Sequence, residues 1–216
     1  MKKYLVILLI CIGSTNLFSQ IVSVTPEAGI VFSGYRNDNI IHDDGIKIGG
    51  MTGVTADYRL TDALCARSGL MLDQKGNYFV MPLSDQFGTP LGELRSFLTK
   101  TYVGVPVLLR VKLYKELYFE GGGYVSYLIR SKIVDINDFN DKNDTTVKHI
   151  ENLGSLKFSD RMNKGLYAAL GVSIPLFGTQ GLQVSVKYDY PLVFNRSREK
   201  YYAFCLSVGY RFKIRD

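Results

Sequence analysis

The stretch near the end of the chain divides its residues into two faces of opposite chemistry. From Tyr202 to Phe212 every second residue is large and apolar, and the residues between them are Ala, Cys, Ser, Gly and Arg. Successive side chains of a β-strand point to opposite faces. The segment therefore needs one apolar environment and a second one that accepts small and polar groups.

The same period-two alternation appears in eight stretches of the chain. They cover Val22–Gly34, Lys47–Leu60, Leu64–Asp73, Thr99–Leu113, Leu117–Arg130, Gly165–Leu176, Leu182–Pro191 and Tyr202–Phe212. Long helical periodicity is missing after residue 20, and 21 Gly and 15 Tyr suit twisted strands with aromatic edges. The sequence predicts an all-β fold, with a bulge at Pro106 because proline cannot donate to a ladder.

The connections between these stretches alternate strictly between short and long. The short ones are Thr61–Ala63, Tyr114–Glu116 and Phe177–Gly181; the long ones are Tyr35–Gly45, Gln74–Leu98, Ser131–Lys164 and Leu192–Lys200. In an up-and-down sheet all short turns then lie at one end, as in outer-membrane barrels with tight periplasmic turns. We expect an eight-stranded antiparallel up-and-down transmembrane β-barrel, comparable in size to the smallest outer-membrane barrels.

The distribution of charge indicates which face points inward. The apolar set has almost no charge in mid-strand, so it would face lipid, and the polar set would fill a narrow lumen. Buried charges need partners, so we predict a lumenal ion-pair network. Its predicted members are Glu27, Asp57, Arg59, Arg67, Arg110, Lys112, Glu120, Arg130, Lys187, Asp189 and Arg211, and Asp73 shares their face. A soluble barrel would show the reverse pattern, and a β-sandwich leaves the alternation of loop lengths unexplained.

The N-terminus has the pattern of a secretory signal peptide. Two lysines precede an apolar run from Tyr4 to Ile12, and small residues follow. The run is too short for a membrane helix, although a retained anchor is the alternative. We expect residues 1–19 to be removed, leaving a single barrel domain over residues 20–216. Loss of Lys2 and Lys3 lowers the formal net charge from +6 to +4, which implies no nucleic-acid partner.

Three segments resemble a known family. YVGVPVLLRVKL (Tyr102–Leu113), EGGGYVSYLI (Glu120–Ile129) and LSVGYRF (Leu206–Phe212) resemble the PorT-like outer-membrane β-barrel family of Bacteroidetes. Its central strand commonly reads YLEIPLLLK, so Gly104 stands where an inward Glu is frequent. The resemblance spans nearly the whole mature chain and implies an outer-membrane location with eight strands. The founding member is associated with a secretion system, but the shared motifs are architectural and do not carry that role over.

Few residues offer chemistry of their own. His42, followed by Asp43 and Asp44, could be drawn as a base with its orienting group, but no nucleophile accompanies it and we expect no enzyme. The acidic loop Asp135–Thr146 lacks the glycine and final glutamate of a calcium loop. Cys65 and Cys205 lie on strands that are not neighbours, so we expect free thiols. We expect no cofactor and no metal.

The remaining function classes depend on the outer loops and the lumen. The first is a structural or interaction protein, whose loops contact a protein or a surface polymer. The residues expected to make this contact are Asp135, Asp138, Phe139, Asp141 and Asp144. The second is a narrow channel or small-ligand transporter. A charged, side-chain-filled lumen favours the first class, and both classes place the chain among the lipids of a bacterial outer membrane.

Overall fold

The computed structural model describes residues 21–36, 44–139, 145–150, 161–176, 180–192 and 200–214. They form nine strands: β1 (Ile21–Arg36), β2 (Asp44–Arg59), β3 (Leu64–Ser84), β4 (Pro90–Tyr114), β5 (Leu117–Phe139), β6 (Thr145–Ile150), β7 (Met162–Pro175), β8 (Gln180–Pro191) and β9 (Lys200–Lys213). The predicted signal peptide lies outside these residues.

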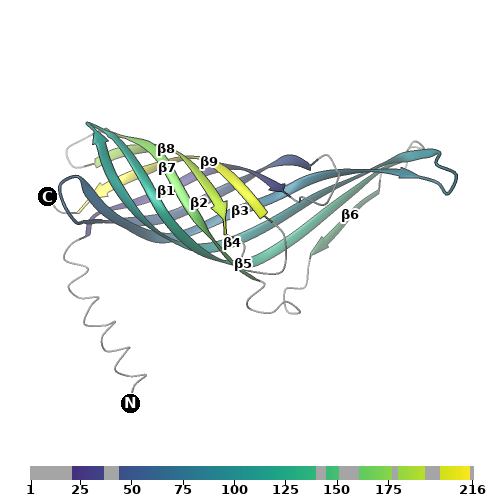
Figure 1. Ribbon diagram of the computed structural model, residues 1–216, viewed down its shortest axis with the longest axis horizontal. Helices are drawn as coiled ribbons and strands as arrows, with labels where there is room; N and C mark the ends of the chain where they lie inside the picture. The colour runs from purple at the N-terminus through teal and green to yellow at the C-terminus, as the bar shows by residue number, and fades with distance from the viewer. Residues whose placement is uncertain are drawn as a thin grey trace, which may run out of the picture.

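Eight of the strands close into a ring. The order is β4-β3-β2-β1-β9-β8-β7-β5, and pairing of β4 with β5 completes the circle (Figure 1). Every pairing is antiparallel, and β6 adds to β5 outside the ring, beyond the point where β5 leaves β7. The predicted eight-stranded barrel is confirmed. In the parts of the chain that the structure describes, no helix is long and apolar enough to cross a membrane.

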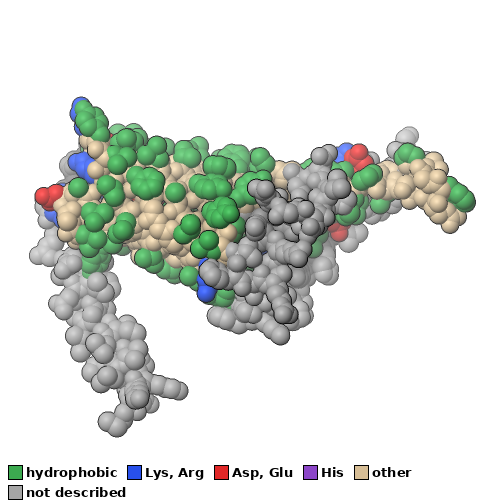
Figure 2. Space-filling view, in the orientation of Figure 1, with side chains coloured by type: hydrophobic (Ala, Val, Ile, Leu, Met, Phe, Trp, Pro, Cys, Tyr) green, Lys and Arg blue, Asp and Glu red, His purple; other side chains and the backbone are tan. Residues whose placement is uncertain are grey.

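The two faces of the strands have the predicted chemistry. Large apolar side chains are exposed on the outer wall, where Ile48 reaches 66% exposure and Val107 reaches 65%. Small and polar side chains are buried inside; in β8, for example, Gln183, Ser185 and Lys187 are all buried. Figure 2 shows hydrophobic side chains across the visible wall, with charged ones near its two ends. This inversion of the soluble pattern suits a barrel surrounded by lipid.

The short connections lie at the end of the barrel where β1 begins and β9 ends (Figure 1). The β2–β3 turn spans residues 60–63, and the β4–β5 turn consists of Lys115 and Glu116 between the paired Tyr114 and Leu117. Lys115 has a φ of 43°, a left-handed conformation that is uncommon outside glycine. By the rule for outer-membrane barrels, this is the periplasmic end.

At the other end the structure corrects the predicted loops. Much of Gln74–Leu98 and of Ser131–Lys164 is strand, because β3 continues to Ser84, β4 starts at Pro90 and β5 runs to Phe139. With β6 these extensions form the outer arm, defined as residues 76–84, 90–99, 131–139 and 145–150, which projects from the barrel in Figure 1. Apolar side chains on both faces obscure its alternation in the sequence.

Local irregularities also differ from the expectation. Pairing of β4 with β5 passes through Pro106 and Tyr124 without a register shift, so the bulge predicted at Pro106 is wrong. A shift occurs instead where Thr101 pairs with Arg130 and Tyr102 with Leu128, which leaves one extra residue in β5. A bulge of this kind reverses the facing of every residue beyond it.

Candidate functional site

The periplasmic half of the lumen contains a layer of paired charges, here called the charge layer: Asp57 (β2), Arg67 (β3), Arg110 (β4), Glu120 (β5) and Gln183 (β8). Arg67 Nε donates to Asp57 Oδ1 at 2.6 Å, and its Nη1 lies 3.1 Å from Glu120 Oε1. Arg110 Nε donates to Glu120 Oε1 at 2.6 Å, and its Nη1 donates to Asp57 Oδ2 at 3.1 Å. Each guanidinium therefore contacts both carboxylates.

Gln183 carries the layer across the barrel. Its Oε1 accepts hydrogen bonds from Arg67 Nη2 at 3.0 Å and from Arg110 Nη2 at 2.9 Å. In the ring β8 lies four strands from β3 in either direction, so these bonds join opposite walls. All five side chains are buried, and the exposed fractions of Glu120 and Arg67 are 1% and 3%. The charge layer therefore spans the lumen with buried side chains.

The layer is balanced in charge, although Gln183 Nε2 is a buried donor for which the described residues supply no acceptor. Two guanidinium groups face two carboxylates, and Ser23 Oγ donates to Asp57 Oδ2 at 2.8 Å. The ring of Tyr118 lies 4.0 Å from the Arg110 guanidinium carbon, within the range of a cation–π contact. Buried charges are tolerated only when each is paired and hydrogen-bonded. These contacts meet that condition for a group that cannot reach water.

Three further ion pairs occupy the lumen. In its middle Lys187 Nζ donates to Glu27 Oε2 at 2.6 Å. Toward the outer arm Lys75 Nζ lies 2.7 Å from Asp73 Oδ2 and donates to Asp189 Oδ2. The ring of Tyr124 lies 5.0 Å from the same ammonium group. Polar pairs therefore follow one another along the barrel axis.

The predicted network residues fall into two groups. Glu27, Asp57, Arg67, Arg110, Glu120, Lys187 and Asp189 are buried and ion-paired within the lumen. Arg59, Lys112 and Arg130 are exposed instead, and Arg211 is half-buried. Arg59 and Lys112 lie near strand ends, where the inward face opens to the periplasmic mouth. The alternation along a strand assigns a face to each residue but does not say how deep in the lumen it lies. Arg130 follows the bulge in β5, which turns its side chain outward.

The sequence interpretation misses two members of the lumenal set. Lys75 falls within a predicted loop, yet it is only 4% exposed and neutralises two carboxylates. Its signal is the continued spacing of Met71, Asp73 and Lys75, which keeps one face pointing inward. Gln183 is predicted to face inward but not to join the network. The alternation within one strand cannot show which residues of different strands meet across a lumen.

The residues expected in the outer loop lie partly in a strand. Asp135, Asp138 and Phe139 belong to β5, and Asp135 accepts a hydrogen bond from Ser96 Oγ at 2.5 Å. Asp141, Asp144, His42 and Asp43 lie outside the described residues, while Asp44 is the first residue of β2. Cys65 and Cys205 are free thiols. No group of three His, Cys, Asp or Glu side chains within the described ranges could hold a metal ion.

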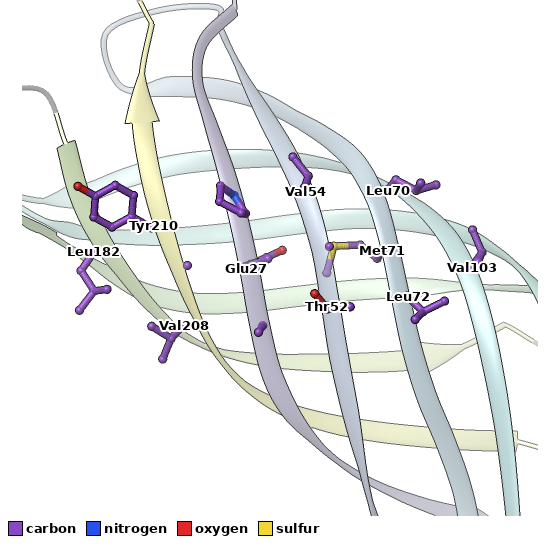
Figure 3. Close-up of a pocket in the computed structure, with 14 residues that line it drawn as sticks. Glu27, Thr52, Val54, Leu70, Met71, Leu72, Val103, Leu182, Val208 and Tyr210 are labelled. Atoms are coloured by element: carbon purple, nitrogen blue, oxygen red, sulfur yellow. The ribbon is translucent and has the colours of Figure 1, made fainter.

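A shallow groove of about 700 Å³ lies in the barrel wall over β1, β2, β3 and β9 (Figure 3). Outward-facing Ala28, Thr52 and Leu70 line it, together with Glu27 and Met71 from the inward set. Most of the lining belongs to the outward set. The groove therefore faces the acyl chains of the surrounding lipid.

A family comparison agrees with this geometry. The model of the outer membrane protein beta-barrel domain family matches residues 18–193. The chain belongs to this family. Membership places the barrel in an outer membrane, with its apolar wall in lipid, and no curated protein matches the chain in sequence.

Several solved outer-membrane proteins are similar to this barrel. Ail of Yersinia pestis is 12% identical, with a TM-score of 0.45 over 89% of this chain and 99% of its own. Neisserial surface protein A is 14% identical, with a TM-score of 0.44 over 88% and 97%. A major outer membrane protein from Thermus thermophilus is 14% identical, with a TM-score of 0.49 over 88% and 99%.

Proposed function

We propose that this outer-membrane barrel does not conduct and that it presents the outer arm to a protein partner outside the cell. The observation that carries the proposal is the charge layer, in which Gln183 joins Arg67 and Arg110 across the lumen. A pore for water or solutes needs an open axis, whereas here the axis is occupied by hydrogen-bonded side chains. At the outer end of the described residues, the exposed part that projects from the barrel is the arm (Figure 1).

The surface of the arm supports a protein partner. Phe79, Met81, Leu94 and Leu98 continue the inward-facing parity of β3 and β4 beyond the barrel, and all four are half-buried. Phe87 at the hairpin tip is 83% exposed. Apolar and aromatic side chains of this kind suit the core of a protein interface better than contact with a polar polymer.

An open strand edge adds to this surface. Pairing of β2 with β3 stops at Phe79, so no second strand among the described residues borders Val80–Ser84. A row of unpaired backbone groups is a template for an added strand. The arm therefore combines apolar side chains with backbone groups that a partner strand could bond.

Conductance in a planar bilayer tests the closed lumen. We expect no resolved channel for the wild type, and we expect current only for Arg67→Ala combined with Gln183→Ala, which removes the bridge between opposite walls. Steady single-channel current through the wild type would overturn the closed lumen and favour a narrow channel or small-ligand transporter. Both proteins need the heat-modifiable mobility of a folded barrel.

A truncation tests the role of the arm. Replacing residues 81–94 with Asn-Gly shortens the β3–β4 hairpin at the paired Val80 and Arg95. We expect the barrel to fold, and a photo-cross-linker at Val80 on intact cells to lose the adduct that it forms in the full-length chain. An unchanged adduct, or no adduct in either chain, would contradict a role in protein binding.

We also propose the narrower assignments that the sequence supports. The motifs over Tyr102–Leu113 and Leu206–Phe212 favour the PorT-like branch, although Gly104 departs from its pattern. The pattern of residues 1–19 favours a cleaved signal peptide before a barrel domain of residues 20–216. N-terminal sequencing of the purified protein should then start at Gln20. We infer no catalytic activity and no cofactor.

A further inference from the structure

A cavity of about 400 Å³ opens at the periplasmic mouth of the barrel. We call it the periplasmic vestibule, and its lining comes from the β2–β3 and β4–β5 turns, both flanks of the β7–β8 connection and the ends of β1, β4 and β9. Its floor is the charge layer, through Asp57 and Arg110. It is separate from the outer arm, so it concerns the opposite end of the molecule.

Among the described residues that line this cavity, cations outnumber anions. Arg59, Lys112, Lys115, Arg211 and Lys213 line it above the floor, against Asp62 and Glu116. Asp57 and Arg110 on the floor already neutralise one another. The walls therefore carry an excess of positive charge, and a concave site lined by one sign of charge concentrates ions of the other sign.

The burial of Arg211 is what distinguishes the vestibule from a basic rim whose charges are all solvated. It is half-buried, and its Nε is a buried donor for which the described residues supply no hydrogen-bond acceptor. Arg59, Lys112 and Lys115 are exposed and can solvate their own charges. A buried donor that lacks an acceptor is unfavourable, and the planar donor fork of arginine matches the oxygens of phosphate. An anionic oxygen in the cavity would provide the acceptor.

We propose that the periplasmic vestibule binds a phosphate group through Arg211, assisted by Lys112 and the neighbouring cations. Two sources offer this chemistry at the inner surface of an outer membrane: a soluble phosphate compound of the periplasm, and the headgroup of a lipid in the inner leaflet. The cavity volume lies within the range of small-molecule sites, so it admits either one.

The test follows the Arg211 Nε–Hε signal by NMR in the folded full-length barrel, in neutral detergent. Inorganic phosphate is titrated at constant ionic strength, with chloride as the reference salt. We expect a saturable shift with phosphate and none with chloride. For the lipid source, the same signal is compared in nanodiscs of phosphatidylglycerol and of phosphatidylcholine. The choline cation compensates the phosphate of phosphatidylcholine, so only the anionic lipid should move the signal.

Variants separate a site from general attraction. We expect Arg211→Gln to weaken binding at least tenfold and Lys112→Gln to weaken it severalfold, followed through the signals of the remaining arginines. Arg130→Gln removes the same charge from the exposed surface near the outer arm and should leave binding unchanged. Lys112→Gln keeps the test available if Arg211→Gln does not fold.

Each outcome decides for or against the site. Saturation by free phosphate assigns a soluble ligand, and a shift confined to phosphatidylglycerol nanodiscs assigns a lipid headgroup; both support the proposal. The proposal is overturned if neither phosphate nor anionic lipid gives a saturable shift. It is equally overturned if Arg130→Gln weakens binding as much as Arg211→Gln does.

Discussion

Glu120 is a buried carboxylate that two arginines share. It is 1% exposed, and its Oε1 contacts Arg67 Nη1 at 3.1 Å and Arg110 Nη2 at 2.5 Å. Glu120→Gln keeps the shape but leaves two buried guanidinium groups with the single carboxylate of Asp57. Breaking a buried ion pair in this way costs about 3–5 kcal/mol. We expect a loss of that size in urea unfolding of the detergent-folded barrel.

The matched control for this change lies on the outer arm. Glu93 is half exposed and contacts Arg95 at 3.3 Å, so Glu93→Gln removes an ion pair that water already screens. A surface pair of this kind is worth about 0–1 kcal/mol. Equal losses for the two variants would show that the lumenal pairs do not stabilise the fold.

Gly171 leaves room for the ring of Tyr118, which occupies the space that a side chain at this position would need. A Cβ built there would lie 2.4 Å from Tyr118 Oη, because the Tyr118 ring lies over this glycine and also stacks on Arg110. Gly171→Ala must displace a buried ring, which costs about 1–3 kcal/mol. The same urea titration measures it, with Gly50→Ala as the control because nothing lies within 4 Å of a Cβ at Gly50. A loss at Gly50 equal to that at Gly171 would contradict this packing.

At the scale of elements, the β3–β4 hairpin ends in a turn that depends on one carboxylate. Asp85 Oδ1 accepts hydrogen bonds from the backbone N–H groups of Thr89 and Phe87, both at 2.8 Å. The bond from Thr89 contributes most to holding the pKa of Asp85 below its ordinary value of 3.8. A carboxyl with a lowered pKa stabilises the folded turn above its unfolded pKa. That contribution is lost as the pH falls through the folded value.

We therefore expect the turn to stay closed at neutral pH and to loosen only in acid, below pH 3.8. A ¹³C NMR titration of the Asp85 carboxyl carbon measures this, and Asp85→Asn should remove the acid dependence of the Phe87 and Thr89 amide shifts. A midpoint at or above 3.8 would contradict the geometry of this turn.

The eight barrel strands follow from the sequence, but their ends do not, and β6 falls within a predicted loop. The alternation over Thr99–Leu113 marks β4, whereas the part of β4 before Thr99 falls within a predicted loop. Tyr78 and Phe97, whose ring centroids lie 4.7 Å apart, show why. Both faces of the arm carry apolar residues, so period two disappears where a strand no longer separates lipid from lumen.

At the scale of the molecule, the short turns at one end of the ring indicate which end faces the periplasm. Phe87 lies at the tip of the arm and Asp62 lies in the β2–β3 turn, at opposite ends of the barrel. In a Cys65→Ser, Cys205→Ser background, a membrane-impermeant maleimide should label Phe87→Cys on intact cells. Asp62→Cys should react only after the outer membrane is permeabilised. The reverse result would invert the barrel in the membrane.

The sequence by itself determined the class of fold and the facing of most residues. In a strand without a bulge, a side chain's face depends only on its position, and the apolar set is continuous enough to require lipid. Seven of the predicted lumenal charges, including Asp57, Arg67 and Glu120, are buried and paired for this reason.

Only the tertiary structure decided how deep each inward side chain lies, which partner it meets, and which face it takes beyond a bulge. The extra residue in β5 turned Arg130 outward, the opening of the mouth exposed Arg59 and Lys112, and closure of the ring brought Gln183 against Arg67. These are relations between strands far apart in the sequence. A pattern within one strand cannot contain them, because they are set by the register and diameter of the closed barrel.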